Sequence, residues 1–424
     1  MAALRRVRDA VRRTRGCFVS PAIEAHAFPR MGTGIRATER IPQDTLVFQA
    51  SADLWRPFSA DFALEQAQLK APGFVQQLQQ LVRSSAQLQQ SPFVANALVL
   101  GVHLVVNAPP PGAQATMAAL TDPQASLQDL YVHALPDFVE LPLYWHEGQL
   151  RELQACHAVR RAVEHSRRFY LQVHEHLFGA NNTMVPRQEF FWALSILLSR
   201  ATSGQQQPFT LIPFFDWFNH GDNGDECAHT FDEQKGFQVV TTKSYEPGEQ
   251  LLINYGHLPN ARLLRNYGFA TAENAHDLVQ VPLPPTLQAL QPQDPASPAK
   301  ARLLDALGVR RAPPSVTIDA NGDVAADHRR WLHVIMATQQ ELDSIMQASS
   351  AASPVIPLSL EQRVDAHVRD LARAHLSSFG TTCEADRKFL EDNNDQMAPW
   401  LRACLNCRVS EKTVLERAIH RLQK

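Results

Sequence analysis

The stretch Phe214-Phe215-Asp216-Trp217-Phe218-Asn219-His220 decides how this chain of 424 residues is interpreted. Asn219 offers a donor and an acceptor on one amide, and His220 can place its ring against a ligand or bond through its nitrogens. An isolated Asn-His pair is usually a cap at the end of a helix or strand. The pair therefore gains meaning only from other segments of the chain.

Three further segments accompany this stretch in a fixed order: Met31-Gly32-Thr33-Gly34-Ile35 upstream, then Gln250-Leu251-Leu252-Ile253-Asn254-Tyr255-Gly256 and Leu263-Leu264-Arg265-Asn266-Tyr267-Gly268-Phe269 downstream. Gly32 and Gly34 leave the main chain uncovered, so a ligand can approach its backbone groups closely. Tyr255 follows an apolar strand and precedes a glycine, so its hydroxyl can point into a pocket while its ring packs. Each segment is a weak signal alone, and their joint order favours one ligand-binding site.

In this order the four segments resemble the SET-domain methyltransferases. The resemblance is to the subfamily typified by the Rubisco large-subunit lysine methyltransferase, which also includes an actin histidine methyltransferase. The strings Thr381–Asp386 and Arg408–Lys412 resemble the same subfamily, so the resemblance covers nearly the whole chain. It implies an α+β fold, in which a SET β-fold with a large helical insertion is followed by an all-α C-terminal substrate-binding domain.

The domain boundaries that we expect follow from this resemblance and from shifts in composition. A proline-rich stretch after about Leu283 reads as a linker to the C-terminal helices. The expected parts are an N-terminal helix with the first part of the SET domain (1–59), the helical insertion (60–187), the SET core (188–283) and the helical substrate-binding domain (284–424).

The resemblance also implies S-adenosylmethionine (AdoMet) as cofactor and a protein side chain as methyl acceptor. Methyl transfer from a sulfonium is an in-line displacement, so the site mainly has to hold two reactants end to end. Tyr255 is implied as the catalytic tyrosine, and Tyr255 and Asp216 as substrate-binding residues near the acceptor channel. An unperturbed tyrosine has a pKa of about 10, so Tyr255 is expected to orient groups rather than act as a strong base. The implied cofactor contacts are Met31, Gly32, Thr33, Gly34, Arg200, Asn219, His220, Tyr267 and Phe269.

Apolar periodicity and turn residues predict several local elements. Short strands are expected over Phe18–Ser51, with a tight turn at Gly32-Thr33-Gly34. A hairpin is expected to pair Gly236–Thr241 with Gln250–Asn254 through the turn residues Glu246–Glu249. Helices are expected over Glu189–Arg200, Arg329–Met346 and Leu358–Leu376.

Composition limits the partners. A net charge of −3 gives no overall cationic field of the kind that binds nucleic acid nonspecifically. No apolar run reaches the roughly 18 residues needed to span a bilayer. We therefore expect a protein substrate as partner, with no direct nucleic acid and no membrane, and a monomeric enzyme.

The compartment is less defined. Six scattered cysteines fit a reducing environment, which predicts an intracellular protein of the cytoplasm or nucleus. The arginine-rich first 16 residues have two interpretations: a basic helix with Val7 and Val11 on one face, or an organelle transit peptide, which leaves plastid or mitochondrion open. Cys404 and Cys407 form a lone CxxC, and a zinc site needs about four ligands, so we expect free thiols and no metal.

Three functions remain open from the sequence. A protein-lysine N-methyltransferase acting on a non-histone protein is favoured. A protein-histidine N-methyltransferase on the same scaffold is the first alternative, because the residues around the acceptor cannot be placed from one sequence. A non-catalytic protein-binding module is the second, and the presence of every cofactor-motif residue argues against it.

Overall fold

The structure is a computed structural model that describes residues 2–107, 122, 124–179, 185–204, 207–309, 312–348, 355–393 and 396–423. The chain divides into two compact units. The first comprises residues 1–143 and 165–257, and the second comprises residues 144–164 and 258–424. Both units mix helices and strands, which confirms the predicted α+β class.

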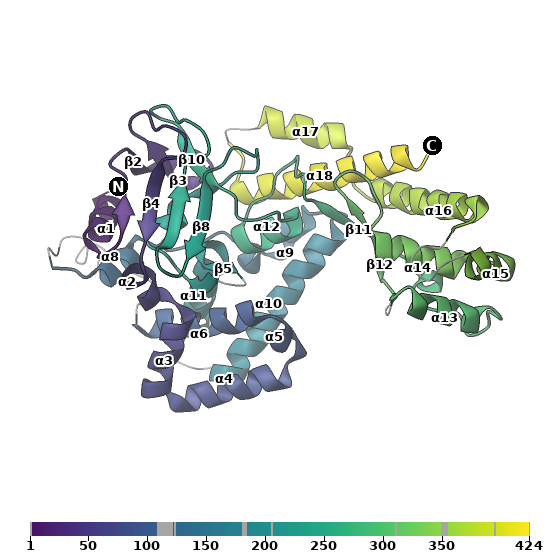
Figure 1. Ribbon diagram of the computed structural model, residues 1–424, viewed down its shortest axis with the longest axis horizontal. Helices are drawn as coiled ribbons and strands as arrows, with labels where there is room; N and C mark the ends of the chain where they lie inside the picture. The colour runs from purple at the N-terminus through teal and green to yellow at the C-terminus, as the bar shows by residue number, and fades with distance from the viewer. Residues whose placement is uncertain are drawn as a thin grey trace. The chain divides into compact units, whose positions relative to one another are not determined.

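Two small sheets form the β part of the first unit (Figure 1). One has the strand order β1-β4-β9-β8 and the other β2-β3-β10-β7. In the second sheet β3 runs antiparallel to β10, whereas β7 runs parallel to it. A two-stranded ribbon, β5-β6, completes the strands, whose bounds are β1 Phe18–Val19, β2 Ile23–Phe28, β3 Gly32–Ala37, β4 Leu46–Ala50, β5 Thr202–Gly204, β6 Gln207–Thr210, β7 Asn219–His220, β8 Ala228–Asp232, β9 Gly236–Val240 and β10 Gln250–Ile253.

Helices surround these sheets in the first unit. Every residue from Phe190 to Leu198 of α11 is buried, so this helix is a core element rather than an amphipathic surface one. α6 packs against it, and Gly101 of α6 faces Leu197. The bounds are α1 Ala2–Arg13, α2 Ala52–Trp55, α3 Ala60–Lys70, α4 Pro72–Ser84, α5 Ala86–Gln90, α6 Pro92–Asn107, α8 Leu127–Ala134, α11 Arg187–Arg200, and α10 His157–Phe178, which belongs to this unit from residue 165 onward.

The N-terminal helix α1 is an integral part of the first unit. Val7 and Val11 are fully buried, and α1 packs against α8. Arg12 donates to the carbonyls of Val19 and Ser20 at 3.1 and 2.9 Å. These contacts favour the interpretation of the segment as a structural basic helix.

Two local predictions in the first unit were wrong. Gly236–Thr241 and Gln250–Asn254 do not form a hairpin, because β9 pairs with β4 and β8 in one sheet while β10 pairs with β3 and β7 in the other. The turn itself is present, since Glu249 N donates to Glu246 O at 3.1 Å. The tight turn expected at Gly32-Thr33-Gly34 lies earlier, at residues 29–31, and the glycines begin β3.

The second unit is mainly helical but contains a small antiparallel sheet, β11-β12, that the sequence did not predict. Val279 and Val281 of β11 and Val316 and Ile318 of β12 belong to its apolar core. The bounds are α9 Glu147–Arg151, the first turns of α10, α12 Asn260–Tyr267, β11 Leu278–Pro282, α13 Ser297–Ala306, β12 Ser315–Asp319, α14 Ala326–Met336, α15 Gln339–Ala348, α16 Leu358–Ser377, α17 Cys383–Asp392 and α18 Pro399–Arg421. Four short 3₁₀ turns, η1 Arg56–Phe58, η2 Pro142–Tyr144, η3 Phe215–Trp217 and η4 Pro285–Leu287, complete the described elements.

The helix predicted over Arg329–Met346 is two helices. α14 ends at Met336 and α15 begins at Gln339. Thr338 caps the second helix: its hydroxyl accepts from Glu341 N at 3.3 Å, and Glu341 Oε2 accepts from Thr338 N at 2.9 Å. This capping box starts a new helix where the apolar periodicity alone suggested a continuous one.

The two C-terminal strings that carried the resemblance meet in a buried ion cluster. Asp386 accepts from Arg408 Nε at 3.0 Å and from Lys412 Nζ at 2.5 Å. All three residues are at most 3% exposed. Arg408 also donates to Thr381 Oγ1 at 2.6 Å, so both strings serve the packing of α17 on α18.

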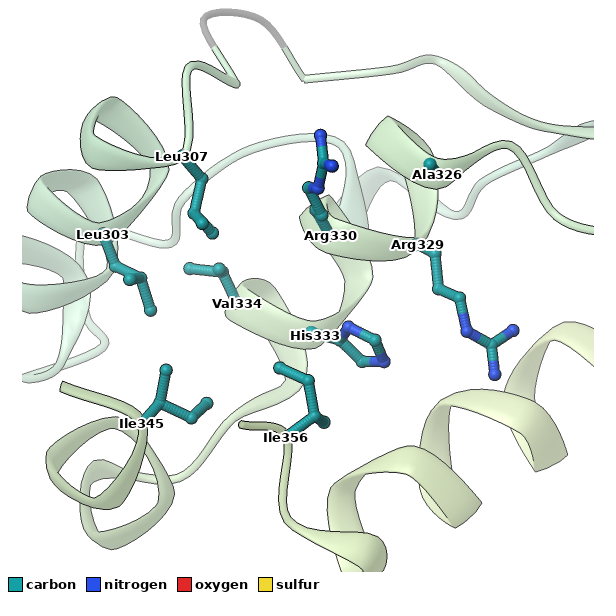
Figure 2. A pocket seen from close by; sticks show the side chains of 9 residues that line it. All are labelled: Leu303, Leu307, Ala326, Arg329, Arg330, His333, Val334, Ile345 and Ile356. Atoms are coloured by element: carbon teal, nitrogen blue, oxygen red, sulfur yellow. The ribbon is translucent and has the colours of Figure 1, made fainter. Parts of the chain in front are cut away.

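A cavity of about 210 Å³ lies among α13, α14 and α15 of the second unit (Figure 2). Apolar side chains converge on it, and Arg329 points away from them (Figure 2). Arg329 is held by Glu361, at 3.0 Å, and by Asp365. The lining residues are Leu303, Leu307, Ala326, Arg329, Arg330, His333, Val334, Ile345 and Ile356, none of which belongs to the four motif segments.

Two further properties bear on the expectations for metal and membrane. Cys404 and Cys407 are free, buried thiols, and burial raises the pKa of Cys404 to about 12. Such thiols stay protonated at neutral pH and are poor metal ligands. Among the helices within the described ranges, none combines the length and apolar character needed to cross a bilayer.

Candidate functional site

Three of the four motif segments meet in the sheet β2-β3-β10-β7. Asn219 and His220 form β7 and lie beside Leu252 and Ile253 of β10. On the other side of β10, Leu251 lies opposite Ile35 of β3. Residues more than two hundred positions apart in the sequence therefore share one small sheet.

Gly34 is the point where the glycine segment approaches the Asn-His pair. A β-carbon at this position would lie only 2.7 Å from Asn219 Nδ2 and 2.4 Å from Gln250 Nε2. Contacts this short are not tolerated, so only glycine leaves both amides in place. The bare main chain of β3 and the two amides together form a cradle, which we define as Gly34, Asn219 and Gln250.

The cradle contains unsatisfied donors. Asn219 Nδ2 and Gln250 Nε2 are buried and have no hydrogen-bond partner in the described part of the chain. Buried amide groups are nearly always bonded in folded proteins, because an unmade hydrogen bond costs about 1–3 kcal/mol. Two such donors side by side indicate a place for a ligand with acceptor atoms.

The loop before the Asn-His pair is strained. Phe214 has φ 74° and ψ −39° although it is a bulky, fully buried residue. Such backbone conformations cost of the order of 1–3 kcal/mol and cluster at functional sites. Here the turn leads into η3 and brings the carbonyls of Asp216 and Phe218 to the partners described next.

Tyr255 is fixed against the same loop at two points. Its backbone N donates to His220 Nδ1 at 3.1 Å, which makes Nδ1 an acceptor. Its hydroxyl donates to Phe218 O at 2.8 Å. The rings of His220 and Tyr255 lie 5.2 Å apart, so the predicted catalytic tyrosine and a predicted cofactor residue are neighbours.

Arg200 and Asp216 form a partly enclosed ion pair. Arg200 Nη1 lies 3.1 Å from both the carbonyl and Oδ2 of Asp216, and the carboxylate is wholly buried. Tyr131 of α8 donates to the same Oδ2 at 2.9 Å. Burial raises the pKa of Asp216, and the charge of Arg200 and the Tyr131 hydrogen bond oppose that rise. The two donors on Oδ2 are therefore the groups that favour the ionised form of this carboxylate against its burial.

The remaining predicted site residues differ in exposure and in location. Met31 is 44% exposed, Gly32 is exposed and Thr33 is half-buried at the start of β3. Tyr267 and Phe269 belong to the second unit, where their rings lie 6.1 Å apart at the end of α12. Burial raises the pKa of the Tyr267 hydroxyl, so this group stays neutral. Their part in cofactor binding stays a prediction.

Two residues that lie in this arrangement were not predicted from the sequence. Gln250 opens β10 and supplies one of the two unsatisfied amides. Gln250 is the first residue of a motif segment, but the apolar alternation of that strand assigns no role to its polar side chain. Tyr131 lies in the helical insertion, far from every motif, and a single tyrosine in a helix reads as a core aromatic.

Known proteins resemble this chain over most of its length. The SET domain family model matches residues 32–256, which is more than half of the chain, and the Rubisco LSMT substrate-binding model matches residues 291–415. The chain belongs to the SET-domain family. Its two family matches also confirm the predicted architecture of a SET fold followed by a substrate-binding domain.

The curated relatives of this chain share low sequence identity with it. The actin-histidine N-methyltransferases of Canis lupus familiaris and Homo sapiens are each 23% identical over 419 residues, or 92% of this chain. The chain spans 64% of the length of these relatives. Among solved structures, Rubisco LSMT bound to sinefungin and monomethyllysine has a TM-score of 0.69 at 19% identity, covering 99% of this chain and 91% of that one. The SET domain of LSMT bound to lysine and S-adenosylhomocysteine (AdoHcy) has a TM-score of 0.68, also at 19% identity.

The cofactor of SET-domain methyltransferases is AdoMet, and the residues of the first unit fit it. The cradle offers bare backbone and two unsatisfied amide donors to a ligand rich in acceptors. Arg200 Nε and Asp216 Oδ1 are likewise buried atoms without a partner among the described residues. A cation and an anion side by side match a ligand whose amino acid end carries both charges.

Proposed function

We propose that this chain is an AdoMet-dependent protein N-methyltransferase that methylates a lysine of a non-histone protein. The cradle is the observation that carries the proposal. Asn219, with an unsatisfied amide, lies against Gly34, where any β-carbon would displace that amide, in the sheet that leads to Tyr255. A structural role alone would have satisfied that amide.

Each residue has a distinct part in this function. Gly34, Asn219 and Gln250 bind the cofactor by close backbone approach and amide donors. Arg200 and Asp216 take its charged amino acid end, so Asp216 is assigned here to the cofactor and not to the acceptor channel that the resemblance implied. Bound AdoMet supplies an electrophilic methyl group, and the protein's contribution is to hold the acceptor in line with it.

The bonding of Tyr255 favours a lysine acceptor. Its hydroxyl donates to Phe218 O, and a hydroxyl oxygen that donates one hydrogen bond can also accept from a donor on the acceptor side chain. A lysine amine attacks through a nitrogen that still carries N–H bonds and can donate to this oxygen. The attacking nitrogen of a neutral histidine carries no hydrogen, so it cannot make that bond. Desolvation in a narrow channel would lower the pKa of the lysine and leave it neutral for attack.

Histidine methylation is the second candidate, because the curated relatives are actin-histidine N-methyltransferases. The same cradle and the same tyrosine would serve it. In that case the acceptor ring would be oriented by groups other than the Tyr255 oxygen, since the attacking nitrogen offers no donor. The second unit, whose sequence matches a substrate-binding model, would hold the protein substrate in either case.

The test is transfer of a labelled methyl group from AdoMet into lysate proteins, followed by acid hydrolysis and separation of the methylated amino acids. Labelled methyl-lysine is the expected product. Labelled methyl-histidine without methyl-lysine would replace the lysine assignment with the histidine one. The lysate comes from cells that lack the gene, so that the acceptor sites are unmethylated. Absence of any transfer into this lysate would rule out both the lysine and the histidine assignment. Tyr255→Phe serves as the control with strongly reduced transfer.

A further inference from the structure

Tyr131 is a buried residue of the helical insertion that reaches the core motif. It is fully buried in α8, a helix that is fixed at both ends. Ser126 and Asp129 form a capping box at its start, and beyond its end Trp192 Nε1 donates to Pro136 O at 3.0 Å. The Tyr131 ring packs edge-on against Phe58 with centroids 4.9 Å apart. The position of its hydroxyl is therefore well determined.

That hydroxyl completes the bonding of the Asp216 carboxylate. Oδ2 accepts from Tyr131 at 2.9 Å and lies 3.1 Å from Arg200 Nη1. The carboxylate is 0% exposed, so water cannot replace a missing donor from the outside. With both donors on Oδ2, the other oxygen is left unbonded and the carboxylate is prevented from rotating.

The unbonded atoms of this trio are one acceptor and one donor. Asp216 Oδ1 and Arg200 Nε are both buried and lack a partner among the residues that the structure describes. A zwitterionic amino acid end would satisfy both, with its ammonium on Oδ1 and its carboxylate on Nε. AdoMet and its product AdoHcy carry this group.

We propose that Tyr131 is a positioning residue of the cofactor site: it locks the Asp216 carboxylate so that Oδ1 and Arg200 Nε receive the amino acid end of the cofactor. The inference rests on the proposed function and extends it to the helical insertion. A purely structural tyrosine would affect stability and leave cofactor affinity and its pH dependence unchanged.

The pH dependence gives the proposal a specific signature. Among the described residues, Tyr131 of α8 and Arg200 of α11 are the titratable or charged groups that act on Asp216. Burial raises the pKa of Asp216, and the Tyr131 hydrogen bond opposes the rise. Removing the hydroxyl raises that pKa further, so Asp216 becomes protonated at a higher pH. Affinity for a zwitterion is then lost earlier as the pH falls.

The experiment compares the full-length protein with Tyr131→Phe, which keeps the ring and removes the hydroxyl. Calorimetry measures the affinity for AdoHcy from pH 6 to pH 9. We expect Tyr131→Phe to bind AdoHcy about tenfold more weakly at pH 7.5, as for one lost hydrogen bond to a charged group, and to lose affinity at a higher pH than the parent as the pH is lowered. Affinity for 5′-methylthioadenosine, which lacks the amino acid end, should be the same in both proteins.

Tyr245→Phe is the matched control, because Tyr245 is also a buried tyrosine of the first unit, 2% exposed, with its hydroxyl near Asp225 O at 3.4 Å. It should bind AdoHcy like the parent protein. Unchanged AdoHcy affinity and pH profile in Tyr131→Phe would overturn the proposal, as would an equal loss for methylthioadenosine. If the parent protein binds no AdoHcy at all, the proposed function itself fails.

A second variant decides the question if Tyr131→Phe does not fold. Asp216→Asn removes the charge but retains an oxygen for the Tyr131 hydroxyl. Its AdoHcy affinity should be at least tenfold lower and independent of pH over the same range. An affinity and a pH profile equal to those of the parent would contradict the role of the trio.

Discussion

Gly34→Ala is the substitution for which the structure gives the sharpest expectation. The new methyl group would lie 2.4 Å from Gln250 Nε2, 2.7 Å from Asn219 Nδ2 and 2.8 Å from the ring of Phe28. To reach an ordinary contact of 3.4 Å, the Gln250 amide must retreat by about 1 Å and the Asn219 amide by about 0.7 Å. Both ends can move, so the protein should fold, but the cradle should lose its geometry.

The magnitude follows from these displacements. Overpacking of this size costs about 1–3 kcal/mol of folding free energy. A misplacement of about 1 Å in a site that works by positioning costs on the order of a hundredfold in rate. We therefore expect a moderately lower melting temperature, AdoHcy affinity reduced at least tenfold, and methyl transfer reduced about a hundredfold.

The assay is calorimetric titration with AdoHcy alongside thermal denaturation. Gly73→Ala is the matched control, because a β-carbon at Gly73, in the first turn of α4, would meet nothing within 4 Å. That control should retain affinity and be as stable as the parent or up to about 1 kcal/mol more stable. A folded Gly34→Ala protein that binds AdoHcy like the parent would refute the cradle.

Three further outcomes are expected. Tyr255→Phe removes the hydroxyl bonded to Phe218 O. It should lower kcat by about a hundredfold while AdoHcy affinity in calorimetry stays unchanged. Equal turnover would count against the catalytic role of Tyr255. Asp386→Ala leaves Lys412 buried without its anion and Arg408 with only the half-exposed Glu152, 3.5 Å away. It should lower the free energy of unfolding in urea by about 3–5 kcal/mol, whereas Asp327→Ala, at an exposed pair, should cost at most about 1 kcal/mol. Comparable losses would mean that the buried cluster is not stabilising. Arg363 lowers the pKa of Glu341 to about 2, so this carboxylate stabilises the fold above its unfolded pKa near 4.5, and the effect disappears as the pH falls towards 2. Glu341→Gln should therefore be about 1 kcal/mol less stable than the parent at pH 6 and nearly equal to it near pH 2.5, and a gap that does not shrink with falling pH would contradict the ion pair.

The order of the motifs indicated the fold class and most of the residues of the candidate site. Glycine at position 34 and the Asn-His pair were recognisable because close backbone approach and amide chemistry demand those residue types. The helices α11 and α16 were recognisable from the number and spacing of their apolar residues. In each case a local constraint was strong enough to be read without knowing the tertiary structure.

The wrong predictions concern strand pairing, which depends on residues distant in the sequence. The turn at Glu246–Glu249 forms as its residues indicate, yet β9 and β10 leave it for different sheets because β4 and β3 provide their partners. The alternation of apolar and polar residues along a strand does not indicate which distant strand will pair with it. The small sheet β11-β12 was missed for the same reason.

Tyr131 shows what sequence patterns leave out of a site. Its role depends on α8 being fixed so that one hydroxyl reaches a carboxylate 85 positions away. A buried tyrosine in a helix is ordinarily part of the core, and only the contact with Asp216 distinguishes this one. The strained conformation of Phe214 is similarly invisible in the sequence, because its aromatic side chain gives no sign of a positive φ.

Titration of AdoHcy into the parent protein and into Asn219→Ala tests the central claim most directly. The account predicts one binding site per chain in the parent and at least tenfold weaker binding in the variant, because the amide at position 219 donates to the cofactor. Absence of binding by the parent, or equal binding by both proteins, would contradict it.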